Sequence, residues 1–404
     1  MSRSRVKIAA VGLGNRTCKY LHYIAEHQDV AELVAVIDID ETRLDQVKGK
    51  FSLSPESCFK TLEELADSGI EVDACIIGTP DIHHYEMTLK SLHYGWHVLL
   101  EKPMAQTQAE CEEIVRVSKQ TGKLVSICYV LRFHPYFIKM KQLTESPQVG
   151  RILSVQHTEK VGRDRLSHTF VRGPWNKTEM NTSVFFTKCC HDVDFVLWLI
   201  GEDVARVDVA KGKKLFTADN APEGVAIRCV NCPLEISCKY SAVELYLRRK
   251  DWIKGFAALQ GECEDDMIRR ILNESRYGRC VYHCPENDVT SHQCINLEMT
   301  SGIRAGITMD CTSEEPNRIT IIECENAIIS GDESIIEVNY RNGQPTETYD
   351  FEWAKEQKFH AGADLLIIKE FIESIHDGHL QTRTPSTTSL ISHNICFLAE
   401  MQIA

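Results

Sequence analysis

The residues best suited to chemistry stand at the end of a short apolar segment. Residues 96–100 read Trp-His-Val-Leu-Leu and are followed at once by Glu101, Lys102 and Pro103. A run of this kind predicts a buried parallel strand, and open α/β sheets bind ligands at the carboxyl ends of such strands. Lys102 at that edge could polarise a hydroxyl oxygen or relay its proton, and Glu101 could pair with a lysine or a ligand hydroxyl. A surface lysine that merely follows a strand is the alternative.

A second group of reactive side chains lies on a helix predicted between residues 185 and 200. Lys188, His191 and Asp192 fall on its first turns, three and four residues apart, and therefore share one side of the helix. Imidazole suits acid–base chemistry because its unperturbed pKa lies near neutrality. His191 is thus a candidate acid or base, and a purely structural histidine is the alternative.

The N-terminal segment predicts a strand, a glycine turn and a helix. Residues 6–11 are apolar and lead into a turn in which Gly12 permits tight bending and Gly14 lets the backbone approach a pyrophosphate. Thr17 stands where the dinucleotide-binding fingerprint has its third glycine, so the fingerprint is incomplete. Asp38 ends the next apolar run, where a carboxylate suits the ribose hydroxyls of NAD and repels the 2′-phosphate of NADP. An ordinary strand-end acid is the alternative for Asp38.

Strands and helices continue to alternate up to about residue 130. Further apolar runs cover residues 73–77, 97–100 and 124–128, and helices are predicted between them, from about 81 to 94 and from 107 to 121. Repeated strand-then-helix units of these lengths predict a doubly wound parallel sheet, so the fold class of this part is α/β.

Composition fits a compact enzyme that acts on small molecules. The chain has 404 residues, of which 43% are hydrophobic and 25% charged, and a formal net charge of −13. An acidic chain without a lysine and arginine cluster is a poor candidate for binding nucleic acid or an anionic membrane. No apolar run approaches the roughly 18 residues that span a bilayer, and no signal-peptide pattern leads the chain. We therefore expect a cytoplasmic protein whose 17 cysteines are reduced thiols.

Four motifs together resemble one known family. They are Gly12-x-Gly14-Asn15-Arg16, Gly78-Thr79-Pro80 with His84, Glu101-Lys102-Pro103, and His191-x-x-Asp194. In order and spacing they resemble the Gfo/Idh/MocA oxidoreductases across nearly the whole chain. The resemblance implies an NAD-binding Rossmann domain over residues 1–130. It also implies, over residues 131–404, an α+β domain with a large, mostly antiparallel open sheet that binds substrate and forms homodimers or homotetramers.

The resemblance also implies roles for individual residues. Lys102 would hold the substrate hydroxyl, and His191 would face the nicotinamide and accept or relay the proton. Many relatives carry an aspartate four residues before this histidine, where this chain has Thr187, so Lys188 becomes a candidate third catalytic residue that also contacts substrate. The candidate cofactor-binding residues are Gly12, Gly14, Asn15, Arg16, Asp38, Thr79, Pro80, His84, Glu101 and Lys102.

Further candidates for substrate binding follow the fifth strand. Tyr129 and Arg132 lie just past it and either contact substrate or seal the joint between the domains. Residues 152–160 alternate like a strand with one polar face, from which His157 and Glu159 could look into a cleft.

Residues 162–182 predict a long polar loop, a kind of segment that is often functional. It contains Arg172 and Trp175, and an indole beside guanidinium groups suits an apolar sugar face flanked by hydroxyls or an acidic substituent. Simple packing is the alternative for Trp175.

Residues 220–290 are typical of an insertion and are rich in cysteine. Cys229, Cys232, Cys238 and Cys280 could form a structural zinc site, but the second C-x-x-C of such sites is missing, so buried free thiols are the preferred interpretation and no metal is expected. After the insertion, an antiparallel meander is predicted, with strands at 293–299, 303–310, 317–323, 326–330 and 335–340. Two helices, near 361–376 and 386–401, close the chain and could pack back on the first domain.

Three functions remain open from the sequence. The first is NAD-dependent removal of hydride from a ring carbon of a sugar or glycoside. The second is a glycosidase that uses NAD for transient oxidation, elimination, hydration and re-reduction with no net NADH. The third is a non-catalytic NAD-binding regulator, which the presence of both Lys102 and His191 disfavours.

Overall fold

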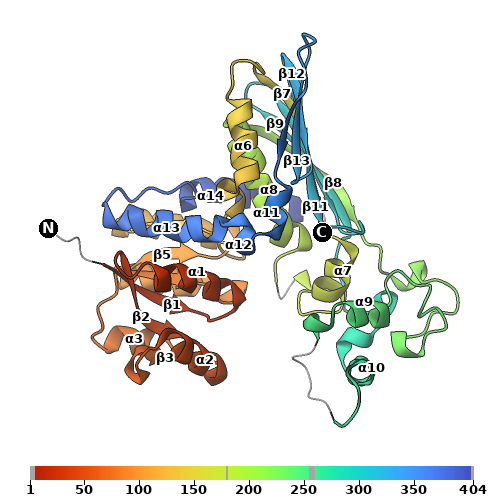
Figure 1. The fold of residues 1–404 in the computed structure, drawn as a ribbon, viewed down its shortest axis with the longest axis horizontal. Coiled ribbons are helices and arrows are strands. Elements are labelled where there is room, and N and C mark those ends of the chain that lie inside the picture. The colour runs from red at the N-terminus through yellow and green to blue at the C-terminus, as the bar shows by residue number, and fades with distance from the viewer. Residues whose placement is uncertain (1–4, 179–180, 254–259, 402–404) are drawn as a thin grey trace.

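Two β-sheets organise the chain, and the first is parallel throughout. The computed structural model describes residues 5–178, 181–253 and 260–401 (Figure 1). The first sheet has the strand order β3-β2-β1-β4-β5-β6. Its strands are β1 (Val6–Val11), β2 (Ala31–Ile37), β3 (Cys58–Phe59), β4 (Ala74–Ile77), β5 (His97–Leu100) and β6 (Val125–Ile127). The predicted doubly wound parallel sheet is confirmed, while β3 has two residues and is too short to give a sequence signal.

Helices connect these strands, and side chains cap the start of three of them. The helices are α1 (Asn15–Glu26), α2 (Glu41–Phe51), α3 (Leu62–Asp67), α4 (His84–His93) and α5 (Gln108–Thr121). Asp40 caps α2 by accepting from the backbone N–H groups of Thr42 and Arg43, and Thr107 forms a capping box with Glu110 at the start of α5. By contrast, no side chain caps the first amides of α1, which begins at the glycine turn.

The second sheet has eight strands in the order β14-β13-β12-β11-β7-β10-β9-β8, and every neighbouring pair except β7 with β10 is antiparallel. The strands are β7 (Ile152–Lys160), β8 (Val204–Lys213), β9 (His292–Met299), β10 (Arg304–Asp310), β11 (Asn317–Cys324), β12 (Ala327–Gly331), β13 (Ile335–Tyr340) and β14 (Glu347–Asp350). The mostly antiparallel sheet is therefore confirmed. Its two edge strands, β8 and β14, were not predicted because few of their side chains are buried.

Strand register brings polar side chains together on the covered face of this sheet. Val155, His157 and Glu159 alternate along the buried side of β7. In the neighbouring strand β11, Arg318 is paired with Glu159 and Thr320 with His157. Residues more than 150 positions apart in the sequence therefore become direct neighbours.

A long helix joins the two sheets. The chain leaves β6 through η3 (Val130–Phe133) and α6 (Pro135–Thr144), and later runs along α8 (Val184–Ile200), which packs against β7 and η3. Arg132 of η3 donates two hydrogen bonds to Asp194 of α8, at 2.7 and 2.8 Å, and both side chains are buried. This bidentate pair fixes α8 against the end of the first sheet.

The first half of the segment predicted as a polar loop at 162–182 is helical, and most of the described residues after Val171 form turns and bends. It contains α7 (Arg163–Arg165) and the π-helical turn η4 (Leu166–Val171). The loop expectation was wrong for residues 163–171, because Leu166, Phe170 and Val171 are buried and hold this part against the core.

The cysteine-rich segment forms a hydrophobic core of its own. Its helical parts include α9 (Ala242–Arg248), η8 (Lys250–Trp252) and α10 (Glu264–Glu274). Eleven buried residues between Cys229 and Cys280 form a cluster distinct from the main core. In Figure 1 this green region extends away from the red and orange strands of the first sheet.

The C-terminal helices return to the first sheet. Four helices close the chain, namely α11 (Glu352–Glu356), α12 (Lys358–Ala361), α13 (Ala363–His376) and α14 (Ser386–Met401). Figure 1 shows the blue helices α13 and α14 beside the red and orange elements, where α13 packs against α1 and α14 against α5. None of the helices in the described ranges combines the length and the apolar character that crossing a bilayer requires.

The Arg132–Asp194 pair gives a stability prediction. Asp194→Asn leaves the Arg132 guanidinium buried without its carboxylate, so we expect the free energy of unfolding to fall by about 3–5 kcal/mol. Asp208→Asn is the matched control, because Asp208 also pairs with an arginine, Arg206, but both side chains are more than half exposed. Urea unfolding followed by circular dichroism should show a large loss for the first variant and no measurable loss for the second. Equal stabilities would contradict this assignment.

Candidate functional site

The glycine turn after β1 forms a cradle that fits a dinucleotide. Gly12 has φ +76°, and a Cβ atom there would lie 2.8 Å from the backbone nitrogen of Thr79, so only glycine fits. Gly14 begins α1, whose first amides carry no side-chain cap and can bind a phosphate at the positive end of the helix. Thr79 Oγ1 is buried and has no hydrogen-bond partner among the described residues. Uncapped amides and an unpartnered hydroxyl are what a bound pyridine nucleotide would satisfy.

Asp38 lies at the adenosine end of this cradle. Its Oδ2 accepts from the backbone N–H of Leu13 at 2.7 Å, and its Oδ1 accepts from the N–H of Asp40 at 2.9 Å. The carboxylate is therefore held beside the turn, at the end of β2, where a ribose hydroxyl would donate to its remaining lone pairs.

A cavity of about 1170 Å³ opens at the carboxyl edge of the first sheet and reaches the second sheet. Lys102, His191, Lys188 and Glu159, each predicted from the sequence as a site residue, line it together with Arg16 and Glu101. The structure thus gathers residues from β5, β7 and α8 around one space. Val130, Leu131 and Phe137 supply an apolar wall.

Lys102 connects the first sheet to α8. It follows β5 directly, and its Nζ donates a hydrogen bond to the backbone carbonyl of Thr187 at 2.7 Å. The Lys102–Pro103 peptide bond is cis. The ammonium group therefore lies at the first turn of α8, beside the helix face that carries Lys188 and His191.

His191 presents a free basic nitrogen. Its Nδ1 is buried and has no partner in the described part of the chain. Burial, together with the positive charges of Lys102 and Arg318, lowers the pKa of His191 well below its ordinary value, so the ring is neutral at neutral pH. The Tyr129 ring packs edge-on against the imidazole, with ring centres 5.5 Å apart. A neutral imidazole held in this way can accept a proton.

Lys188 and Glu159 are two further titratable groups that line the cavity. Burial lowers the pKa of Lys188 to about 8, helped by Lys102 and Arg165 and opposed by Glu159. Burial also raises the pKa of Glu159 to about 8, helped by Asp192 and opposed by Arg318. Because the cavity disfavours the charged form of each group, both titrate close to neutral pH, where a proton can be exchanged easily.

Arg318 is the centre of a buried ionic cluster below these groups. Its Nε lies 2.6 Å from Asp192 and 3.0 Å from Glu159, and its Nη1 lies 3.2 Å from Glu333. His157 completes the cluster, with Nε2 2.8 Å from Asp192 and Nδ1 2.9 Å from the Thr320 hydroxyl. Burial alone would raise the pKa of Asp192, but Arg318 and His157 outweigh it and hold that pKa well below its usual range. Asp192 is therefore a fixed negative charge next to His191.

Several predicted substrate residues do not line the cavity. His157 has both ring nitrogens engaged in the ionic cluster, and Tyr129 is buried with its hydroxyl next to Ser392 and His393. Arg132 is committed to Asp194. Tyr129 and Arg132 therefore make contacts inside the protein, as expected for residues that seal the joint between the domains. Tyr129 also packs against the His191 ring.

Arg172 and Trp175 also lie away from the cavity. Arg172 is 1% exposed, and its guanidinium donates to the backbone carbonyls of Arg279 and Tyr240 at 2.7 Å each. Arg172 therefore connects the insertion to the rest of the second domain and does not face a ligand. Trp175 lines a separate space of about 210 Å³ beside Thr182 and Glu400.

The predicted cofactor residues Arg16, Glu101 and His84 are held by protein contacts. Glu101 accepts from Arg16 Nε at 2.8 Å and from the Tyr20 hydroxyl at 2.7 Å. Burial alone would raise the pKa of Glu101, but Arg16 and Tyr20 outweigh it and keep that pKa below its ordinary value. The two ring nitrogens of His84 lie 2.6 and 2.9 Å from the carbonyl oxygens of Pro103 and Thr79. His84 thus braces the two loops that border the cradle.

The structure does not support the zinc site. Within the described ranges, no group of three or more His, Cys, Asp or Glu side chains could hold a metal ion. Cys229 instead contacts the Arg172 guanidinium, with Sγ 3.7 Å from Nη2, and a cation beside this thiol opposes metal binding. Cys232, Cys238 and Cys280 are free thiols, as are all cysteines of the chain.

The sequence did not predict that Arg318 and Glu333 belong to the site. Arg318 alternates with buried Thr320 and Ile322 along β11, so an arginine on the buried face of a strand was the available signal. Glu333, with φ +72°, lies in the turn after β12 and gave no comparable signal.

The Lys188–Glu159 pair yields a titration prediction. The neutral amine reacts with acetic anhydride, so modification of Lys188 should reach half its maximal rate near pH 8, against about 10.4 for an unperturbed lysine. Glu159→Gln removes a charge that raises the pKa of Lys188 and should shift the midpoint to lower pH. Glu315→Gln, an exposed carboxylate at the same cavity, is the control and should leave it unchanged. Peptide mass spectrometry measures the rates, and a midpoint near 10 in wild type would refute the buried environment.

The N-terminal part of the chain matches a known protein family. Residues 6–129 match the model of an oxidoreductase family with an NAD-binding Rossmann fold, GFO_IDH_MocA. The inositol 2-dehydrogenase of Salmonella typhimurium is 25% identical over 243 residues, which cover 58% of this chain and 68% of that enzyme.

Solved structures share the fold over the whole chain. An oxidoreductase from Agrobacterium radiobacter, in complex with NAD+, L-tartaric acid and magnesium, superposes with a TM-score of 0.72 at 15% identity, covering 99% of this chain and 96% of that one. The WlbA dehydrogenase of Bordetella pertussis, in complex with NADH and UDP-GlcNAcA, gives 0.68 at 16% identity and coverages of 100% and 98%. Both likenesses concern the fold. Residues 6–129 thus match the NAD-binding Rossmann domain of the Gfo/Idh/MocA oxidoreductases.

Proposed function

We propose that this chain is an NAD-dependent dehydrogenase that oxidises a secondary alcohol on the ring of a carbohydrate. The observation that carries the proposal is the convergence of Lys102, Lys188 and His191 on one cavity at the carboxyl edge of the Rossmann sheet. NAD, when bound in the glycine cradle, supplies the hydride acceptor. The inositol 2-dehydrogenase named above supports a polyhydroxylated ring as substrate.

Each side chain has a role that follows from its surroundings. Lys102 carries the ammonium group that can hold the hydroxyl oxygen and stabilise the negative charge that develops on it. His191 offers an unpartnered nitrogen in a neutral ring and accepts the hydroxyl proton. Lys188 and Glu159 titrate near pH 8 and can pass that proton towards solvent. Asp192, held ionised by Arg318, stabilises the imidazolium that forms on His191.

Substitution of the two central residues tests the proposal. Lys102→Ala and His191→Ala should each lower kcat for the oxidised sugar by about 100-fold or more, because each removes a group that acts on the reacting hydroxyl. NADH formation at 340 nm, measured with a panel of inositols, free sugars and aryl glycosides, identifies the substrate and gives the rates.

Exposed residues of the same types provide the controls. Lys119→Ala on α5 and His93→Ala on α4 remove exposed side chains outside the cavity and should keep wild-type rates. His191→Ala should still bind NAD with wild-type affinity in calorimetry, because His191 lies on α8 rather than in the glycine turn. Unchanged turnover in both Lys102→Ala and His191→Ala would exclude the site.

Glycoside cleavage through transient oxidation is the second candidate. The observation that favours it is the additional pair of acid–base groups, Lys188 and Glu159, in the same cavity. Breaking a C–O bond next to a transient ketone needs removal of a neighbouring C–H proton and protonation of the leaving group. Aryl glycosides separate the two functions. Aglycone release without accumulated NADH, with deuterium uptake at the adjacent carbon in D2O, indicates cleavage, whereas stoichiometric NADH indicates net oxidation.

A further inference from the structure

The central cavity is more basic than the chain that forms it. Ten arginine and lysine side chains line it but only six aspartate and glutamate side chains, although the whole chain has a net charge of −13. Several of these cations are neutralised by protein carboxylates, as Arg16 is by Glu101 and Arg318 is by Asp192. The excess positive charge therefore resides on the cations that have no such partner.

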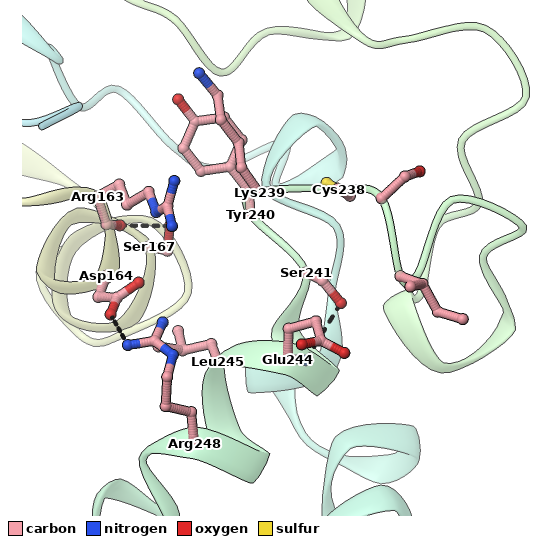
Figure 2. Close-up of a pocket in the computed structure, with 12 residues that line it drawn as sticks. Arg163, Asp164, Ser167, Cys238, Lys239, Tyr240, Ser241, Glu244, Leu245 and Arg248 are labelled. Atoms are coloured by element: carbon pink, nitrogen blue, oxygen red, sulfur yellow. Dashed lines mark hydrogen bonds and ion pairs between the residues drawn. The ribbon is translucent and has the colours of Figure 1, made fainter. Parts of the chain in front are cut away.

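Arg165 and Arg249 are two cations of that kind. Arg165 ends α7, Arg249 directly follows α9, and both are exposed and line the cavity. Over residues 5–178, 181–253 and 260–401, no carboxylate lies within ion-pair distance of either guanidinium. The adjacent Arg248 provides the contrast, because it reaches across to Asp164 and forms an ion pair at 2.8 Å (Figure 2).

Both guanidinium groups lie against the Trp252 ring. The Cζ atom of Arg165 lies 5.1 Å from the centre of the Trp252 ring, and that of Arg249 lies 5.5 Å from it. The indole itself packs against the hydrophobic core of the insertion, which gives the arginines a fixed platform. Burial and then the charge of Arg249 lower the pKa of Arg165, so the two cations repel each other. Two like charges held together without a counter-ion favour binding of an anion that contacts both.

The arginine pair belongs to the same cavity as the proposed catalytic residues. Arg165 also contributes to the lowered pKa of Lys188, which shows that the two side chains are electrostatically coupled. A guanidinium presents a planar fork of N–H donors that matches carboxylate and phosphate oxygens. A ligand bound by the pair through such a group can therefore extend a ring towards Lys188 and Lys102.

We propose that the substrate is an acidic carbohydrate whose carboxylate or phosphate group is bound by Arg165 and Arg249 at the mouth of the cavity. This inference rests on the proposed dehydrogenase function and names its substrate class. The shared chemistry is an oxyanion with at least two acceptor oxygens. A uronic acid would supply it as a carboxylate, and a sugar phosphate or nucleotide sugar would supply it as a phosphate.

Isothermal titration calorimetry on the NAD-loaded full chain tests the proposal. Inorganic phosphate, glucuronate and glucose are the probes, and glucose is the neutral match for glucuronate. At least one anion should bind, glucose should bind more weakly, and the anion's affinity should fall as salt is added because the interaction is electrostatic. Tighter binding of glucuronate identifies the carboxylate source, and tighter binding of phosphate identifies the phosphate source.

Variants locate the anion. Arg165→Gln combined with Arg249→Gln should weaken anion binding by about tenfold or more, because two charge-assisted contacts are lost. NAD affinity and the thermal unfolding midpoint should remain those of wild type. Arg276→Gln is the matched control, an exposed arginine of the same insertion outside the cavity. Arg165→Lys and Arg249→Lys keep the charge but lose the fork, and each should give an intermediate loss.

Two results would overturn the proposal. One is the absence of binding of both anions to the wild-type protein at millimolar concentration. The other is equal anion affinity in wild type and the double variant. Neither depends on turnover, so they are separate from a failure of the dehydrogenase function, which would appear as loss of NAD binding or as unchanged turnover in Lys102→Ala and His191→Ala.

Discussion

One hydrogen bond holds the reactive groups in a common frame. Lys102 Nζ donates to the carbonyl of Thr187, so the end of a strand in the first sheet is fixed to the first turn of α8. Helical geometry then determines where Lys188 and His191 lie relative to the ammonium group. The buried Arg132–Asp194 pair holds the same helix about two turns further on. The relative position of the two sheets therefore determines the distances among the side chains of Lys102, Lys188 and His191.

Electrostatics around this frame favour proton transfer. Lys102 and Arg318 lower the pKa of the buried His191 imidazole, and Lys102 and Arg165 lower that of the buried Lys188 amine. Burial strengthens these effects because water does not screen the buried groups fully. Arg318 is the most strongly compensated of these cations, since it contacts three carboxylates. The positive charge of Arg318 keeps the pKa of the buried Asp192 low, so Asp192 stays ionised. For Glu159 the same charge does not outweigh burial, so the pKa of Glu159 is raised.

Local sequence patterns predicted most of the fold, whereas contacts between residues far apart in the sequence could not be predicted. Glycines, apolar runs and the Glu101-Lys102-Pro103 ending were enough to predict the first sheet and the place of Lys102 at its carboxyl edge. His157 and Glu159 were placed correctly on one face of a strand, but whether that face meets a ligand or a protein cluster depends on Arg318, more than 150 residues away. Tyr129 and Arg132 were ambiguous for the same reason, because their partners lie on α14 and α8. Arg165 and Arg249 are brought together by Trp252, and nothing local to any of the three indicates it.

The separate hydrophobic core of the insertion has a consequence for the evolution of this enzyme fold. Residues between Cys229 and Cys280 stabilise one another, and Trp252 rests on them rather than on either sheet. Exchanging or rebuilding this module would therefore change the side chains at this end of the cavity while leaving Lys102, Lys188, His191 and the glycine cradle in place. In the function proposed above, selectivity and reactivity would thus be encoded in parts of the polypeptide that can diverge independently.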